Sequence, residues 1–499
     1  MADAALYKQL KEEFVSNCTG TSVGEIALVV TTAPIAVLLR DVASAWFGIS
    51  QLSETFIGLK LLFDFSMLIL PVQLCFTLLA DHTTQILTTL LMFILGILIA
   101  SRSITSYKTS KNGGTITNTL DILNKKLSAH RPFISGFRAY VNIATAISIL
   151  AVDFRIYPRR FAKVETYGSG LMDVGVGAFV ISNAIVSREA KGKHDQHSSV
   201  GSALSSLLRS IKSCSPLILL GLVRLLSVKS TDYQEHVSEY GVHWNFFFTL
   251  AVVKVLSTVV FTLFSPVWSG VLGILITCVY QYCLEFTGLR NIILHGSDGS
   301  DSREGFLNAN REGISSCLGY LAIYCIGVQI GRHIFKPRER LKDWLWLLLE
   351  IVLLDLLSWG LYFVCDRHIE PISRRMANIS FVIWMVSYNL QSLGSFLLAD
   401  LIYQITIPDP TLTASGKNAG DVAIDEKHIL DEQCLLTAIN RNGLFYFLLA
   451  NLLTGAVNFS IKTLFMADIP AFMVITAYMF LLSAVSVFLH TFNITVKFW

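Results

Sequence analysis

The sequence predicts an all-α protein, a polytopic transmembrane bundle of about 13 spans, from three observations. Of its 499 residues, 53% are hydrophobic and only 15% are charged, whereas soluble proteins carry about 25% charged residues. The apolar residues gather in stretches of about 20, the length that an α-helix needs to cross a bilayer. The polar stretches between them are too short for a separate soluble domain. We therefore expect one integral-membrane domain over residues 1–499.

Thirteen apolar segments are long enough to be predicted as spans. In chain order they cover residues 24–46, 55–80, 84–101, 133–152, 167–187, 202–228, 244–264, 266–286, 313–331, 343–364, 376–403, 441–464 and 469–490. The first half of 202–228 contains Arg209 and Lys212, so this half has an alternative interpretation as an amphipathic helix along the membrane surface. Segments 244–264 and 266–286 meet at Phe-Ser-Pro-Val-Trp, which predicts a hairpin.

Lys and Arg concentrate in three short loops, 102–132, 187–201 and 332–342. With thirteen spans these loops fall on one side of the membrane, and the positive-inside rule assigns that side to the cytosol. Residues 1–23 then form a lumenal N-terminal tail, and the C-terminus is cytosolic. Residues 404–440 lie on the cytosolic side, and their Pro, Gly, Ser and Asp content predicts a flexible loop.

Charge and cysteine spacing limit the other possibilities. The formal net charge is +3, which gives no case for a nucleic-acid partner. The nine cysteines show no Cys-x-x-Cys or Cys/His spacing, so no metal site is predicted. The polar N-terminus lacks the apolar core of a signal peptide. Asn17 begins a glycosylation triplet in the predicted lumenal tail, which gives weak support for this orientation.

Charged residues collect in the segment 153–173, between the fourth and fifth spans. The candidates are Asp153, Arg155, Arg159, Arg160, Lys163 and Asp173. On the predicted topology these cations are lumenal, against the positive-inside tendency. They belong either to an ordinary surface loop or to a site for phosphate, which arginine binds through two parallel hydrogen bonds. Asp173 stands within an apolar segment, and an acid in that position is a functional hypothesis by default.

Three further polar clusters fall on the same predicted side. They contribute Glu239, His243, Asn245, Asn310, Arg311 and Arg374 as candidate substrate-binding residues. For the cluster at 237–250 the alternative is interfacial aromatic packing. For the cluster at 308–314 the alternative is ordinary helix capping. Glu239 and His243 are four residues apart and would share a helix face. The common location of all four clusters predicts one polar site at the lumenal end of the bundle.

The pair Asp153 and Lys163 suits acyl transfer to a hydroxyl group. A carboxylate can take the proton of the acceptor alcohol, and a lysine can stabilise the developing oxyanion. The sequence has no GxSxG, Walker A, HExxH, GxGxxG or His-x4-Asp motif. His490 is deep in an apolar run, where a packing role is expected. On physical grounds alone, a lipid or solute transporter remains an equal alternative to an enzyme.

Several stretches resemble the glucosaminyl-phosphatidylinositol inositol acyltransferases of glycosylphosphatidylinositol (GPI) anchor synthesis. They are ILAVDFRIYPRRFAKVETYGSGLMDVGVGAFVISNAIVS (149–187), EYGVHWNFFFTL (239–250), NANREGI (308–314), ISRRMANISFVIW (372–384) and NGLFYFLLANLLTGAVN (442–458). The resemblance runs from residue 14 almost to the end of the chain. The loops at 102–132 and 404–440 carry no recognised motif.

The resemblance implies a thirteen-span protein of the endoplasmic reticulum. Such an enzyme moves a fatty acyl group, typically palmitoyl, from acyl-CoA to the inositol 2-hydroxyl of glucosaminyl-phosphatidylinositol (GlcN-PI). Asp153 and Lys163 match the family's catalytic acid and lysine. Acyl-CoA would be a co-substrate, with no bound cofactor, and GlcN-PI and membrane lipids would be the other partners. The sequence identifies no protein partner.

Overall fold

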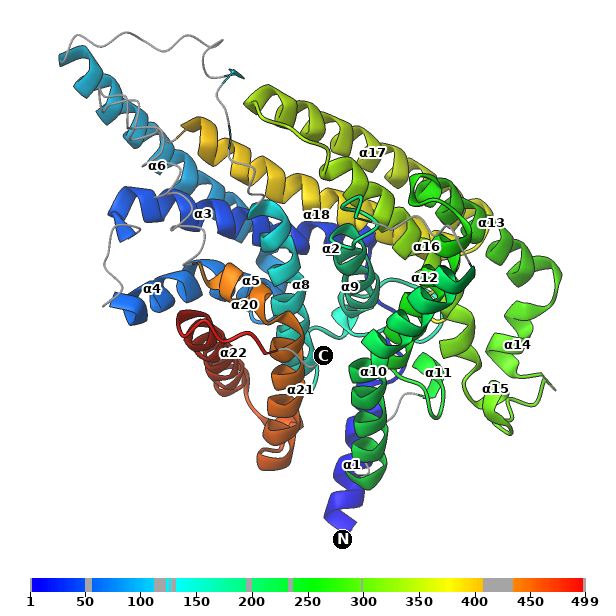
Figure 1. Ribbon diagram of the computed structural model, residues 1–499. Coiled ribbons are helices and arrows are strands. Elements are labelled where there is room, and N and C mark those ends of the chain that lie inside the picture. Colours follow the sequence, from blue (N-terminus) through cyan, green and yellow to red (C-terminus); the bar gives the residue numbers. More distant parts are fainter. Residues whose placement is uncertain are drawn as a thin grey trace.

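The computed structural model describes residues 2–49, 56–111, 123–124, 127, 132–193, 200–231, 237–297, 299–406 and 434–496. Every regular element in this part of the chain is a helix, so the predicted all-α class is confirmed. Within the described residues, twelve stretches are long and apolar enough to cross a membrane, and a thirteenth apolar helix is shorter. The long helices pack side by side in one bundle (Figure 1).

The helices follow the predicted spans closely. The first half of the chain forms α1 (Ala2–Val15), α2 (Val23–Val30), α3 (Thr32–Phe47), α4 (Ile57–Asp64), α5 (Leu70–Phe76), α6 (Thr83–Lys111), α8 (Pro132–Ala151), α9 (Val174–Ile185) and α10 (Val200–Thr231). The second half forms α11 (Val237–Tyr240), α12 (Phe246–Leu263), α13 (Ser269–Phe286), α14 (Leu289–His295), α15 (Phe306–Ala309), α16 (Arg311–Ile334), α17 (Leu341–His368), α18 (Ile379–Thr406), α20 (Leu435–Arg441), α21 (Gly443–Ser460) and α22 (Asp468–Thr491).

The fifth predicted span, 167–187, differs most from its prediction. Its α-helical part is α9, whose 12 residues rise about 18 Å, less than the roughly 30 Å hydrocarbon core. The stretch 152–173 before α9 contains no α-helix, yet Phe154, Tyr157 and Phe161 within it are fully buried. Neighbouring helices α8, α16 and α18 pack against α9. Irregular backbone suits a membrane protein where other protein segments cover it, so apolar composition here reflects burial in protein.

Small residues bring α9 and α16 close together. A Cβ atom on Gly327 would lie 2.8 Å from the Cβ of Ala184, and one on Gly331 would lie 2.4 Å from the carbonyl oxygen of Ile185. Real Cβ atoms do not approach other atoms so closely, so these positions of α16 require glycine. Close backbone approach through small residues is a common way for membrane helices to associate.

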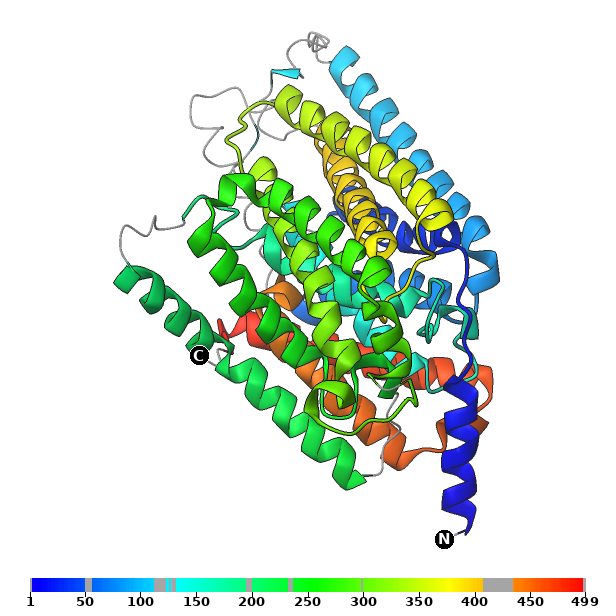
Figure 2. The same cartoon turned by 90° about the vertical axis from the view of Figure 1, so that its right-hand side faces the viewer.

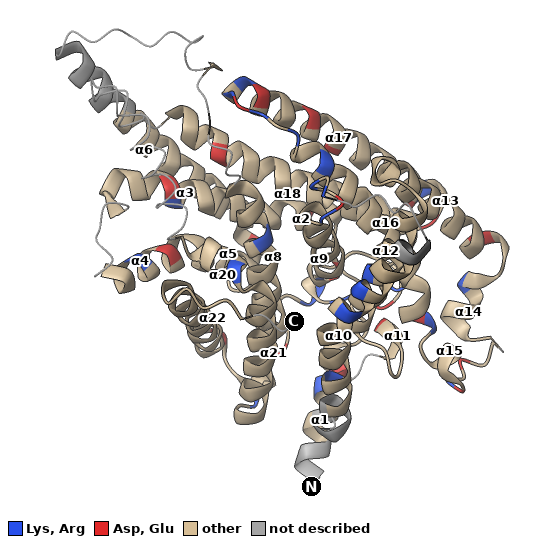
Figure 3. Cartoon of the chain, viewed as in Figure 1, with Lys and Arg blue, Asp and Glu red and all other residues tan. Residues whose placement is uncertain are grey.

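The outer helices present apolar side chains on their exposed faces. On α17, for example, Leu353, Leu357 and Phe363 are 57%, 60% and 58% exposed. Charged residues are sparse along the long helices (Figure 3). Such faces are expected to contact lipid, because monomeric soluble proteins rarely expose large contiguous apolar patches.

Three other expectations concern particular segments. The segment 202–228 lies in one continuous helix, α10, rather than in a surface helix followed by a span. In the predicted loop 404–440, α18 ends at Thr406 and α20 begins at Leu435, and residues 407–433 lie outside the described part. The predicted N-terminal tail contains α1, which overlaps α10 in Figure 1 but is well separated from it in Figure 2.

Candidate functional site

The polar clusters of the sequence meet at one end of the bundle. The backbone N–H of Gly168 donates to the carbonyl of Ile372 at 2.9 Å, which joins the segment 152–173 to the turn before α18. The N–H of Val242 donates to the carbonyl of Ala309 at 2.9 Å, which joins the turn before α12 to the end of α15, just before α16. Segments far apart in the sequence therefore form one polar surface.

Four of the predicted residues form a continuous chain of charges. The Nζ of Lys163 lies 2.9 Å from Oε2 of Glu239, and Oε1 of Glu239 lies 3.0 Å from Nη1 of Arg374. On its other side, the Nε of Arg374 lies 2.8 Å from Oδ1 of Asp173. Charge therefore alternates along the order Lys163, Glu239, Arg374, Asp173. Lys163 and Asp173 come from the segment 152–173, and the other two come from two distant segments of the chain.

The backbone around Asp173 explains the glycine at position 170. The N–H groups of Val164 and Gly170 both donate to Oδ2 of Asp173, at 3.2 and 2.9 Å. A Cβ on Gly170 would lie 2.1 Å from the carbonyl oxygen of Ala162 and 3.0 Å from Oδ2 of Asp173. Only glycine lets the chain fold back over this carboxylate, which satisfies an acid that would otherwise be costly to bury.

Burial decreases along the charge chain toward Lys163. The side chains of Asp173 and Arg374 are 0% and 5% exposed, whereas those of Glu239 and Lys163 are 12% and 39% exposed. Burial by itself would raise the pKa of Glu239, but the cations of Lys163 and Arg374 outweigh it and lower this pKa to about 2. The side chain of Lys163 is thus the accessible end of this chain of ion pairs.

Asp153 belongs to a separate group of side chains. Its Oδ1 lies 3.2 Å from the Nζ of Lys11 on α1, and its Oδ2 accepts a hydrogen bond of 2.7 Å from Nδ2 of Asn458 on α21. Lys11 also donates to Oδ1 of Asn458 at 2.5 Å. Asp153 lies two residues after the end of α8, so this triad ties α1, α8 and α21 together.

Asp153 and Lys163 do not contact each other in the described part of the chain. The side-chain contacts of Asp153 are with Lys11 and Asn458, and Lys163 contacts Glu239. The structure therefore shows no direct contact through which Lys163 could orient Asp153. Residues 154–162, which contain no α-helix, separate the two residues and carry each to a different partner.

Arg159 uses its donors within its own segment. The Nη2 of Arg159 donates to the carbonyls of Val152, Phe154 and Tyr157, at 2.9, 3.2 and 3.0 Å. The guanidinium also stacks on the ring of Phe14, with its Cζ 3.9 Å from the ring centroid. This arrangement holds the turn that follows α8.

Arg160 is engaged as well, whereas Arg155 is exposed. The Nε of Arg160 lies 2.9 Å from Oε1 of Glu25, and its Nη2 lies 2.5 Å from Oδ1 of Asp81. These pairs connect the segment to α2 and to the turn before α6. Arg155 is exposed and makes no polar contact with the described residues, so it retains its donors for a ligand.

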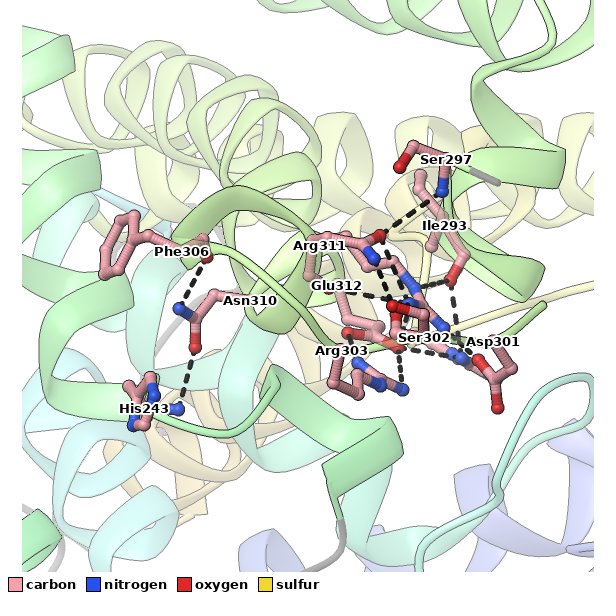
Figure 4. Close-up of polar contacts among 12 residues, drawn as sticks. His243, Ile293, Ser297, Asp301, Ser302, Arg303, Phe306, Asn310, Arg311 and Glu312 are labelled. Carbon is pink, nitrogen blue, oxygen red and sulfur yellow. Dashed lines mark hydrogen bonds and ion pairs between the residues drawn. The ribbon is translucent and has the colours of Figure 1, made fainter. Parts of the chain in front are cut away.

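Asn310 and Asn245 organise the backbone. Asn310 accepts a 2.8 Å hydrogen bond from the backbone N–H of His243 and donates to the carbonyl of Phe306 at 2.8 Å (Figure 4). Asn245 caps α12 by accepting from the N–H of Phe247 at 3.1 Å, as capping asparagines do. Ordinary capping is the alternative for the cluster at 308–314, but the side chain of Asn310 makes no capping hydrogen bond to α16.

Arg311 and Glu312 form the centre of a second charged cluster. Glu312 is fully buried, and three guanidinium groups surround it: Arg303 at 2.8 Å, Arg375 at 2.7 Å and Arg311 at 3.7 Å. Arg311 also pairs with Asp301. Figure 4 shows Asn310 and Arg311 pointing to opposite sides of the start of α16. This cluster fixes the turn between α14 and α16.

Two residues that sequence reasoning missed are Lys11 and Asn458. Lys11 lies in a polar N-terminal helix with other charged residues, and nothing in the sequence distinguishes it from them. Asn458 lies in the apolar segment 441–464, where a polar residue is itself a signal of a buried contact. That signal identifies the position but not its partner, which lies 305 residues away.

Two further features lie apart from this arrangement. A pocket at the start of α8, lined among others by Arg40, Asp41, Asp400 and Cys434, contains none of the predicted site residues. It adjoins the first residues of α8, about 30 Å along that helix from its other end, where Asp153 lies. Among the described residues, no group of three or more His, Cys, Asp or Glu side chains is placed to hold a metal ion.

The geometry supplies the two kinds of group that acyl transfer requires. Asp153 presents a carboxylate that is held by two donors, and Lys163 presents an ammonium that is held by a carboxylate. Carboxylates serve as proton acceptors, and fixed cations stabilise developing negative charge.

Comparison with known proteins shows full-length similarity. The family model described as GWT1 matches residues 7–489. The glucosaminyl-phosphatidylinositol-acyltransferase PIGW of Bos taurus is 38% identical over 514 residues, with 99% of each chain covered. The protein of the same name from Homo sapiens is 38% identical over 513 residues, again with 99% of each chain covered. The GPI-anchored wall transfer protein 1 of Gibberella zeae is 36% identical over 530 residues, which cover 100% of both chains.

Proposed function

The chain belongs to the GWT1 family, and on this premise we propose that it transfers a fatty acyl group to the inositol of GlcN-PI in GPI-anchor biosynthesis. Relatives named as glucosaminyl-phosphatidylinositol acyltransferases align with this chain over 99% of its length. The twelve helices suited to crossing a membrane in the described part of the chain make it a multi-pass membrane protein. The full-length match favours an acyltransferase over the alternative of a lipid or solute transporter.

We further propose the finer features of this reaction. The donor is an acyl-CoA, with palmitoyl-CoA as the first candidate, and the acceptor atom is the inositol 2-hydroxyl. The protein resides in the endoplasmic reticulum membrane with its N-terminus lumenal and its C-terminus cytosolic. The charged end of the bundle, with Asp153 and Lys163, then faces the lumen. The bias of Lys and Arg toward the three loops on the other side supports this orientation.

In the proposed mechanism, Asp153 is the general base and Lys163 stabilises the oxyanion. Asp153 takes the proton from the inositol hydroxyl as its oxygen attacks the thioester carbonyl carbon. Lys163 stabilises the negative charge that develops on the carbonyl oxygen. The carbon–sulfur bond then breaks, the acyl group stays on the inositol oxygen, and the departing CoA thiolate takes up the proton. The observation that supports these roles is that each side chain is held in place by its own partner, Asn458 or Glu239.

The remaining predicted residues divide between substrate contact and support. We assign Arg155 to phosphate binding, because it is exposed and makes no polar contact with the described residues. Arg159 and Arg160 support the backbone, since carbonyl groups engage Nε and Nη2 of Arg159 and carboxylates engage Nε and Nη2 of Arg160. The ring of His243 remains a candidate for contact with a sugar hydroxyl. Asn245, Asn310 and Arg311 shape the wall of the site, and Asp173 with Arg374 anchors the charge chain.

An acylation assay on microsomes tests the proposed function. Microsomes that contain the protein are given GlcN-PI and labelled palmitoyl-CoA, and we expect a labelled lipid that resists phosphatidylinositol-specific phospholipase C, because that cleavage requires a free 2-hydroxyl. Asp153→Asn and Lys163→Ala should each abolish the product at unchanged protein levels. A wild-type protein that moves GlcN-PI across the membrane without acylating it would favour the transporter. Normal turnover by Asp153→Asn would remove this residue from the role of base.

A further inference from the structure

One arginine of α10 lies inside an apolar stretch and was not among the predicted site residues. Arg224 is located in the span Leu204–Leu226, two residues before its end, and its side chain is exposed. Among the described residues, Arg224 makes one hydrogen bond, from its Nη1 to Oδ1 of Asn451 on α21, and this bond is long at 3.5 Å. A charged side chain in a span is disfavoured unless it has a function or reaches the membrane surface.

The position of Arg224 is set by contacts one turn earlier on α10. Nδ2 of Asn245 donates to the carbonyl of Gly221 at 2.9 Å, which fixes α10 against the start of α12. A Cβ on Gly221 would lie 2.7 Å from the ring of Phe248, so glycine is required for this approach. Residues three apart share a helix face, and Arg224 therefore extends from the side of α10 that is anchored at the polar end of the bundle.

Arg224 lies close to the charge chain described above. It is one of three cations, with Lys163 and Arg374, whose charges lower the pKa of Glu239 to about 2 against the opposing effect of burial. Lys163 and Arg374 contact Glu239 directly, whereas Arg224 makes no ion pair with the described residues. It contributes positive charge near the site while its own guanidinium stays accessible.

The helix opposite Arg224 carries the residue that holds Asp153. Asn451, which accepts from Arg224, and Asn458, which donates to Asp153, are seven residues apart on α21. Seven residues make two helical turns, so both amides project from the same face. One face of α21 therefore contacts the guanidinium of Arg224 on α10 through Asn451 and the carboxylate of Asp153 through Asn458.

We propose that Arg224 binds the phosphodiester of the lipid acceptor where it reaches the site between α10 and α21. This inference rests on the proposed function, in which the acceptor is GlcN-PI. An exposed arginine near the end of a span is at the depth of lipid phosphates, and its planar guanidinium binds phosphate through two hydrogen bonds. The inositol 2-hydroxyl is on the ring carbon next to the one that bears the phosphate. Holding the phosphate therefore restricts where that hydroxyl can lie.

Steady-state kinetics with both substrates varied separately test this assignment. We expect Arg224→Gln to raise the KM for GlcN-PI about tenfold or more, with little change in kcat or in the KM for palmitoyl-CoA. Arg224→Lys, which keeps the charge but not the planar fork, should have an intermediate KM for GlcN-PI. Arg209→Gln is the matched control, because Arg209 is exposed on the same helix about 22 Å away along its axis. It should behave as the wild type.

Two results would overturn the assignment. An unchanged KM for GlcN-PI in Arg224→Gln, at normal protein levels, would mean that Arg224 only extends to the membrane surface. If the KM for palmitoyl-CoA rises and the KM for GlcN-PI does not, Arg224 binds the acyl donor and not the lipid acceptor. Both results require an active wild-type enzyme, so they are distinguishable from failure of the proposed function, in which the wild type forms no acylated product. If the Arg224→Gln protein does not accumulate, the KM of Arg224→Lys for GlcN-PI is the test. A wild-type value of that KM would contradict the assignment.

Discussion

The ammonium of Lys163 lies 2.9 Å from the carboxylate of Glu239, a residue 76 positions further along the chain. Glu239 in turn binds Arg374 at 3.0 Å. One carboxylate thus fixes both the accessible lysine of the site and a buried arginine. Because Glu239 has this double role, its substitution should affect catalysis and stability together.

Replacement of Glu239 by glutamine should reduce acylation by about 100-fold, the loss expected when a catalytic group is displaced by roughly 1 Å. It should also lower the thermal unfolding temperature, because removing one partner of a buried ion pair leaves Arg374 less well compensated. Activity and unfolding of the detergent-purified protein measure both effects. Glu239→Asp keeps the charge and is the matched control. Wild-type turnover by Glu239→Gln would contradict the positioning role.

The low pKa of Glu239 predicts a pH dependence of stability. Its value is about 2 in the folded protein, against a usual value of 4.5. The stabilisation from the ionised carboxylate is therefore fully present above about pH 4.5, and it is lost as the pH falls toward 2. We expect the difference in unfolding temperature between the wild type and Glu239→Gln to be constant above pH 5 and to shrink at lower pH. A difference that stays the same down to pH 3 would show that the charge of Glu239 is not its source.

Substitution of Gly170 by alanine should damage the site. The added Cβ would lie 2.1 Å from the carbonyl oxygen of Ala162, so the loop has to move and Asp173 loses its two backbone donors. Overpacking of this kind costs about 1–3 kcal/mol, and activity should fall as well. Gly175→Ala is the control, since its Cβ would have one neighbour, Thr145, at 3.9 Å. Equal unfolding temperatures for the two variants would contradict the prediction.

Lys11 and Asp153 should be energetically coupled. Both side chains are buried, at 9% and 5% exposure, and they lie 3.2 Å apart. We expect Lys11→Met to lower both activity and the unfolding temperature. It should have a much smaller effect on stability in an Asp153→Asn background, because contacting residues show coupling of about 0.5–3 kcal/mol in double-mutant cycles. Additive effects on stability would mean that the two side chains act independently.

Hydropathy predicted most of the fold, because membrane spans are recorded locally in the sequence. About 20 consecutive apolar residues meet the requirement of a bilayer-crossing helix whatever the rest of the chain does, and twelve such stretches are helices in the structure. The fifth segment is the exception. Its apolar side chains, such as Ile181 and Ile185, are buried by protein, and composition does not distinguish that burial from contact with lipid.

The sequence by itself therefore determined the membrane bundle, the family, and the common end at which the polar segments collect, because span number and loop charge assign each segment to one side. Only the tertiary structure decided which charges meet. Asp153 pairs with Lys11 and Asn458, and Lys163 pairs with Glu239. These hydrogen bonds and ion pairs depend on separations of a few ångströms between residues that are up to 305 positions apart. Such distances follow from helix packing, which no local pattern records.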